Sequence, residues 1–218
     1  VSYYVWLTTQ FSSPINVAIP SGNFGNAYSA WFGRQHGLSI KNILCSTNVN
    51  DVLRRFIESG TLEPKETHPS IAPSMDIQIP SSLERLIFDL SGSAEHFYNT
   101  FSTTGDATLE DDALNTLKMI FSSETFNDEE IKHKIGELYK EFDYIFDPHT
   151  ATSVAMALNN EDHIPTVAVA TASPEKFGTV INAVIEGYSI VSLDEKEELV
   201  QLAVDKDIIA TEIKNFFK

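Results

Sequence analysis

The pattern that most constrains the fold of this chain is an apolar run that breaks at glycine and passes directly into a helical pattern. Residues 15–19 are mostly β-branched and apolar, which predicts a buried strand, and residues 26–36 read as a helix. Gly22 and Gly25 lie between the two. Such a turn directs main-chain N–H groups toward one point, where the helix dipole adds partial positive charge. The pattern predicts a phosphate site.

The glycine spacing excludes two common kinds of phosphate site. A dinucleotide fingerprint requires G-x-G-x-x-G, whereas Gly22 and Gly25 are separated by two residues and no third glycine follows in place. A P-loop requires a lysine at the helix start, and no lysine occurs between Val1 and Leu38. From the glycines alone an alternative stays open, namely a tight turn in which they only permit unusual backbone angles.

Strand and helix patterns alternate along the chain. A strand is predicted at 41–46, a helix at 50–59, a returning strand at 165–170 and a helix at 174–186. Such alternation predicts an α/β fold, with a parallel sheet between layers of helices.

The chain divides into three predicted parts. Residues 1–90 form the phosphate-loop part, residues 91–146 a helical insertion or subdomain, and residues 147–218 return to the sheet and end in closing helices. The insertion is expected to contain helices at 94–102, 109–122 and 128–141, and the closing helices are expected at 194–204 and 208–217.

Composition excludes several classes of partner. The net charge is −16, with 15 basic and 31 acidic residues, which opposes binding to nucleic acid or to an anionic membrane. No apolar run approaches 18 residues, and Val1–Leu7 lacks the basic start of a signal peptide. The single cysteine, Cys45, allows no internal disulfide and suits the reducing cytoplasm. Apart from His149, which is considered below, the histidines show no ligand spacing, and no metal site is predicted.

Five blocks of sequence together resemble threonine synthase, a pyridoxal 5'-phosphate (PLP) enzyme of the tryptophan-synthase-β type, or fold type II. The resemblance runs from about Val1 to about Ile185, in the order of the family, and matches its C-terminal half. The blocks are SGNFGN at 21–26, the segment 47–60, the segment 70–89 with its PSMD motif, FDPHTA at 146–151, and VATASPEKF at 169–177.

The resemblance implies a three-layer parallel sheet, here a partial domain, and a PLP cofactor. It implies that the cofactor phosphate is surrounded by Gly22, Asn23, Phe24, Gly25 and Asn26. Main-chain N–H groups do most of this binding, so Phe24 is expected to take part only through its backbone. For Asn23 and Asn26 the alternative is turn formation and helix capping.

Two further residues have competing interpretations. The resemblance places Thr171 at the pyridine nitrogen of the cofactor, whereas the alternative is a cap for the helix after Pro174, a position that Ser173 can fill. His149 can act as an acid–base group or hold a ligand, but we favour a role in capping a helix and stabilising its turn.

The Schiff-base lysine of the family lies well upstream of the glycine loop. Every lysine here occurs from Lys41 onward, and Lys176 is interpreted as structural. We therefore expect no catalytic residue in this chain, with the rest of the enzyme upstream of Val1. None of the four arginines is assigned to the substrate.

The implied reaction converts O-phospho-L-homoserine and water to L-threonine and phosphate. The chain alone is expected to be inactive, because it lacks the lysine. The alternative is a noncatalytic relative or fragment that binds PLP or another phosphate.

Overall fold

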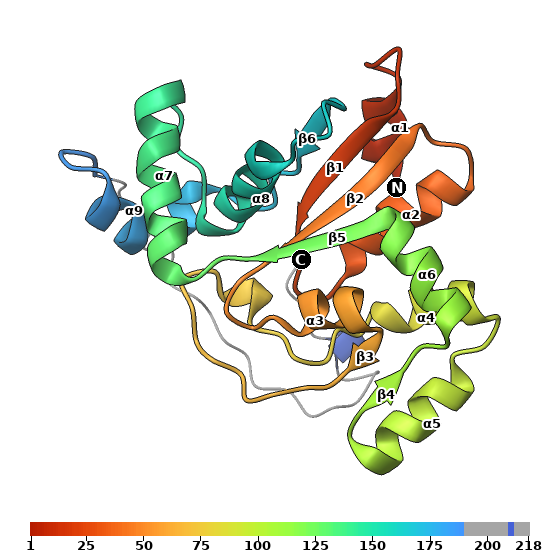
Figure 1. The fold of residues 1–218 in the computed structure, drawn as a ribbon. Coiled ribbons are helices and arrows are strands. Elements are labelled where there is room, and N and C mark those ends of the chain that lie inside the picture. The colour runs from red at the N-terminus through yellow and green to blue at the C-terminus, as the bar shows by residue number, and fades with distance from the viewer. Residues whose placement is uncertain (190–208, 212–218) are drawn as a thin grey trace.

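A four-stranded parallel sheet forms the centre of the molecule, in the order β5-β2-β1-β6 (Figure 1). The computed structural model describes residues 1–189 and 209–211. Its strands are β1 (Ile15–Pro20), β2 (Ile40–Thr47), β5 (Phe121–Thr125) and β6 (Thr166–Ala168). Every residue of β1 is buried, as expected for a strand between two others. The parallel sheet predicted from strand–helix alternation is confirmed.

The side chains of β1 alternate between two helical layers. Val17 and Ile19 belong to the main core cluster, together with residues of α2 (Gly25–Gln35). Ala18 points the other way and packs with residues of α8 (Pro148–Asn159). The chain therefore has a three-layer α/β/α architecture, which fulfils the predicted fold class.

The remaining helices complete these layers. The layer with α2 also contains α1 (Ser2–Thr8), α3 (Val52–Ser59), α4 (Leu83–Ser91), α5 (Glu95–Thr104) and α6 (Asp111–Ile120). The layer with α8 contains α7 (Asp128–Phe142) and α9 (Gly178–Val184). Two 3-10 turns, η1 (Pro73–Met75) and η2 (Pro174–Phe177), and an antiparallel pair, β3 (Thr61–Leu62) with β4 (Ala107–Thr108), complete the described elements. None of the described helices combines the length and apolar character needed to cross a membrane.

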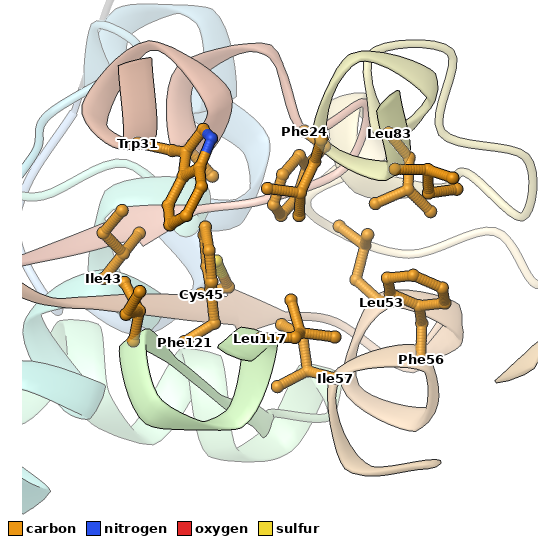
Figure 2. Packing of buried hydrophobic residues seen from close by; sticks show 14 of the residues in the cluster. Phe24, Trp31, Ile43, Cys45, Leu53, Phe56, Ile57, Leu83, Leu117 and Phe121 are labelled. Carbon is orange, nitrogen blue, oxygen red and sulfur yellow. The ribbon is translucent and has the colours of Figure 1, made fainter. Parts of the chain in front are cut away.

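Aromatic rings connect the glycine loop to the core. Phe24, which precedes α2, lies 5.6 Å from Phe121 of β5, and Trp31 of α2 lies 5.8 Å from the same ring, measured between centroids. All three are buried in the cluster of Figure 2. Burial of rings of this size is a dominant source of core stability.

Strand β5 was not foreseen. The helix expected at 109–122 ends at Ile120, and the polar segment that follows pairs with β2, with hydroxyl contacts such as Thr47 Oγ1 to Thr125 Oγ1 at 2.8 Å. The block 91–146 therefore contributes a strand to the main sheet as well as helices. The helix expected at 174–186 is present as η2 followed by α9. The closing helices expected at 194–204 and 208–217 lie outside the described residues, except for 209–211.

Candidate functional site

The turn between β1 and α2 presents a row of main-chain N–H groups that have no partner in the described part of the chain. Among the described residues, none of the N–H groups of residues 22–27 donates a hydrogen bond. These groups lie at the start of α2, an 11-residue helix whose dipole places partial positive charge there. Unpaired donors at a helix N-terminus form the arrangement in which anions bind.

Phe24 sets the shape of this turn. Its φ of 66° places it in the left-handed region, which is uncommon for a residue with a side chain. The ring is only 2% exposed, because it is packed into the core. Burial of the ring holds the backbone in this conformation, and only the main chain of Phe24 faces the turn.

Gly22 is required for a close backbone approach rather than for an unusual backbone angle. A Cβ atom built on Gly22 would lie 2.6 Å from the carbonyl oxygen of Ser74 and 2.9 Å from Cα of Met75. One built on Gly25 would have Ser82 Oγ at 3.5 Å as its nearest neighbour. Neither glycine has a positive φ. The alternative in which these glycines only permit unusual angles is therefore wrong.

A cavity of about 230 Å³ opens beside the turn, at the carboxyl edge of the sheet. Val169 N–H bonds to the Ala18 carbonyl at 2.8 Å, which continues the pairing of β6 with β1 toward Thr171. The turn and Thr171 are thereby brought to the same cavity. Its lining residues are Pro20, Ser21, Gly22, Asn23, Phe24, Gly25, Asn26, Ala27, Ser74, Met75, His149 and Thr171.

The two asparagines of the turn differ in their side-chain contacts. Asn23 Oδ1 accepts a hydrogen bond from Ser81 N–H at 2.6 Å, and the Asn23 carbonyl accepts one from Ser82 N–H at 3.2 Å. The side chain of Asn23 is thus engaged in joining the turn to the start of α4. The side chain of Asn26, a residue that lines the cavity, makes no hydrogen bond within the described part of the chain.

Asp147 caps α8 and connects two walls of the cavity. Its side chain accepts hydrogen bonds from the main-chain N–H groups of His149 and Thr150, at 2.9 and 3.4 Å. Its Oδ1 also lies 3.0 Å from Nδ1 of His149, and its Oδ2 accepts a bond from the Thr150 hydroxyl. Thr150 Oγ1 in turn accepts from Thr171 N–H at 3.3 Å. The residue that caps α8 is therefore Asp147 and not His149. The sequence signal that could have identified it is an aspartate directly before a proline at the start of a helix.

The ionised form of Asp147 is favoured by these contacts. Burial raises the pKa of this carboxyl, but the hydrogen bonds from His149 and Thr150 outweigh that effect and hold the pKa below its usual range. The side chain is 1% exposed. Asp147 is therefore a buried carboxylate whose charge depends on its donors.

A second buried network holds η1 at the cavity. Asp76 Oδ1 accepts hydrogen bonds from Asn48 Nδ2 at 2.6 Å, from Asn50 Nδ2 at 3.0 Å and from Ser70 Oγ at 2.7 Å. Asn48 and Asn50 are buried. The segments 47–60 and 70–89, which supply these residues, belong to the blocks that carried the resemblance, but the contacts between them were not predicted from the sequence.

Three other chemically capable side chains, those of Arg54, Arg55 and Cys45, do not line this cavity. Arg54 and Arg55 both form ion pairs with Asp51, at 2.6 and 2.9 Å. Burial raises the pKa of the Cys45 thiol to about 12, which keeps it protonated and inert. No lysine lines the cavity, and no group of three potential metal ligands occurs among the described residues.

Comparison with known proteins identifies threonine synthases among the relatives of this chain. No family model matches the chain. It is 32% identical to a threonine synthase of Pseudomonas aeruginosa, over 81% of this chain and 40% of the relative. It is 35% identical to a threonine synthase of Corynebacterium glutamicum, over 85% of this chain and 42% of the relative. The chain thus spans less than half the length of these relatives.

Comparison of structures agrees. A crystal structure of PLP-bound threonine synthase from Brucella melitensis superposes with a TM-score of 0.80 at 29% identity, covering 84% of this chain and 41% of that one. The chain therefore has the helix-flanked parallel fold of the PLP-dependent enzymes of fold type II. Within that class, it is homologous to part of the threonine synthases.

Proposed function

We propose that this chain supplies the phosphate side of the PLP site of a threonine synthase. The observation that carries the proposal is the turn at residues 22–27, whose N–H groups lack acceptors within the described structure and border the same cavity as Thr171. Among the residues that the structure describes, no acidic side chain lines that cavity, which favours an anion as its occupant. The residues present therefore fit the phosphate group of PLP.

Each part of the cavity has a proposed role. The main-chain N–H groups of residues 22–27 and the side chain of Asn26 bind the phosphate. The hydroxyl of Thr171 donates to or accepts from the pyridine nitrogen, and because it is neutral it does not force that nitrogen to be protonated. When bound, PLP supplies an electron sink that stabilises carbanions of the substrate. The chain's own contribution is to bind and orient the cofactor.

The reaction proposed for the whole enzyme is conversion of O-phospho-L-homoserine and water to L-threonine and phosphate, in the cytoplasm. The cavity of about 230 Å³ is smaller than the roughly 300–1,000 Å³ of complete ligand sites, and no lysine of residues 1–189 or 209–211 lines it. Both observations support a partial site, in which the lysine that holds the cofactor aldehyde comes from elsewhere. The same observations favour the second candidate, a noncatalytic chain that binds PLP or another phosphate.

A titration with two forms of the cofactor tests the proposal. PLP should bind the chain at least about ten times more tightly than pyridoxal, which lacks the phosphate, because charge-assisted hydrogen bonds to the turn are lost. Cofactor fluorescence measures both affinities, and the aldehyde-free pair pyridoxine 5'-phosphate and pyridoxine, measured in the same way, separates phosphate binding from reaction of the aldehyde with lysines. Adding O-phospho-L-homoserine to the loaded chain should release no phosphate. Equal affinities would contradict the proposed phosphate site, and turnover would contradict the partial site.

A further inference from the structure

His149 lies at a junction between α8 and the wall of the cavity. Its side chain is 4% exposed, and the ring centroid lies 5.0 Å from that of Phe177. Nδ1 is 3.0 Å from Asp147 Oδ1, and Nε2 is 3.2 Å from the main-chain nitrogen of Ser74. Both ring nitrogens therefore have partners, which leaves neither free to exchange a proton with a ligand.

The partners determine the tautomer. The main chain of Ser74 can only donate at its nitrogen, so Nε2 must accept and carries no hydrogen. The carboxylate of Asp147 can only accept, so Nδ1 must carry the hydrogen. The imidazole is thus neutral, with its proton on Nδ1. A protonated ring would turn a second N–H toward that of Ser74 and lose this bond.

Ser74 in turn forms part of the cavity wall that contacts the glycine turn. The Ser74 carbonyl and Cα of Met75 occupy the space that a Cβ of Gly22 would need. The segment Pro73–Met75 is therefore held between Gly22 on one side and His149 on the other. A shift of this segment away from Gly22 would widen the cavity where the phosphate is proposed to bind.

The geometry points to His149 as a positioning residue. Asp147 fixes the neutral imidazole with its hydrogen on Nδ1, and the ring then holds the Pro73–Met75 segment against the glycine turn. In this way His149 sets the width of the cavity at the end where the phosphate is proposed to bind. The same carboxylate supports Thr171 through Thr150, so one buried group positions both ends of the proposed cofactor site. This inference rests on the proposed function in one respect, namely that the ligand of the cavity is PLP.

The tautomer can be read directly from the ¹⁵N resonances of the unmodified chain. Nδ1 should show the signal of a protonated ring nitrogen and Nε2 that of an unprotonated one. A hydrogen on Nε2 would overturn the inference, and this reading requires no variant that has to fold.

Two substitutions distinguish the hydrogen bond of His149 with Asp147 from its hydrogen bond with Ser74. The shorter amide of His149→Asn can still donate to Asp147 but does not reach Ser74, whereas the longer amide of His149→Gln can place an oxygen near the position of Nε2. Hydrogen exchange of the Ser74 amide should be about tenfold faster in His149→Asn and close to that of the unmodified chain in His149→Gln. His36→Asn, at an exposed histidine directly after α2, is the matched control and should leave this rate unchanged.

The affinity of the same variants for PLP tests whether the position of the Pro73–Met75 segment affects ligand binding. PLP should bind His149→Asn about five to ten times more weakly and should regain most of its affinity in His149→Gln. Unchanged Ser74 exchange in His149→Asn would overturn the inference, as would faster exchange with unchanged PLP affinity. If PLP failed to bind even the unmodified chain, the proposed function would fall, while the tautomer and exchange measurements would still decide whether His149 holds Ser74.

Discussion

Replacing Asp147 with alanine should lower the free energy of unfolding by about 3 kcal/mol, because buried donors lose their acceptor and α8 loses its cap. The side chain is 1% exposed and accepts from both the main chain and the side chains of His149 and Thr150. Urea unfolding followed by circular dichroism measures the loss.

Asn127→Ala is a suitable comparison. Asn127 caps α7 through a capping box, but at an exposed site, so its loss should cost only about 1 kcal/mol. Equal costs for the two caps would show that the contacts of Asp147 with His149 and Thr150 add nothing beyond capping.

The same carboxylate gives a pH dependence with a defined sign. The folded-state pKa of Asp147 lies below the ordinary 3.8, so its stabilising contribution is complete above that value and is lost as the pH falls through the folded pKa. The difference in stability between the unmodified chain and Asp147→Ala should therefore shrink below about pH 4. Acid titrations of both proteins provide this measurement.

Replacing Gly22 with alanine should cost about 1–3 kcal/mol of stability, the range typical of an overpacked site. The added Cβ would meet backbone atoms of Ser74 and Met75, at 2.6 and 2.9 Å, which cannot move aside as a flexible side chain can. The segment must shift, so binding of PLP should weaken as well. Denaturant unfolding and cofactor titration of the same preparation measure the two effects.

Gly25→Ala provides the matched control. It adds the same methyl group in the same turn, but with no atom nearer than 3.5 Å and at the first residue of a helix. Because alanine is favoured over glycine in helices, stability should be unchanged or slightly raised. If both substitutions destabilised the chain equally, close approach at Gly22 would not explain the sequence of the turn.

The sheet and the turn were predictable because they depend on local patterns. The β-branched run before Gly22 and the helical pattern after it are each formed by consecutive residues. The sequence also led us to expect that Phe24 takes part only through its main chain. The burial of the Phe24 ring is consistent with that expectation.

The features that sequence reasoning missed depend on tertiary contacts. Strand β5 has the polar sequence FSSET and becomes a strand only because β2 offers it hydrogen-bonding partners. Asn48 and Asn50 bond to Asp76 from more than 20 positions away, and the bond from Ser74 to His149 spans 75 positions. A pattern in neighbouring residues cannot predict contacts between residues so far apart in the sequence.

The central claim is that the amides of the β1–α2 turn bind the phosphate of PLP, and backbone ¹⁵N–¹H spectra test it most directly. Addition of PLP should shift the signals of residues 22–27, together with Thr171, and addition of pyridoxal should leave the turn signals unchanged. Shifts confined to other surfaces, such as the cavity of about 490 Å³ beside α5, or equal shifts of the turn with both compounds, would contradict the account.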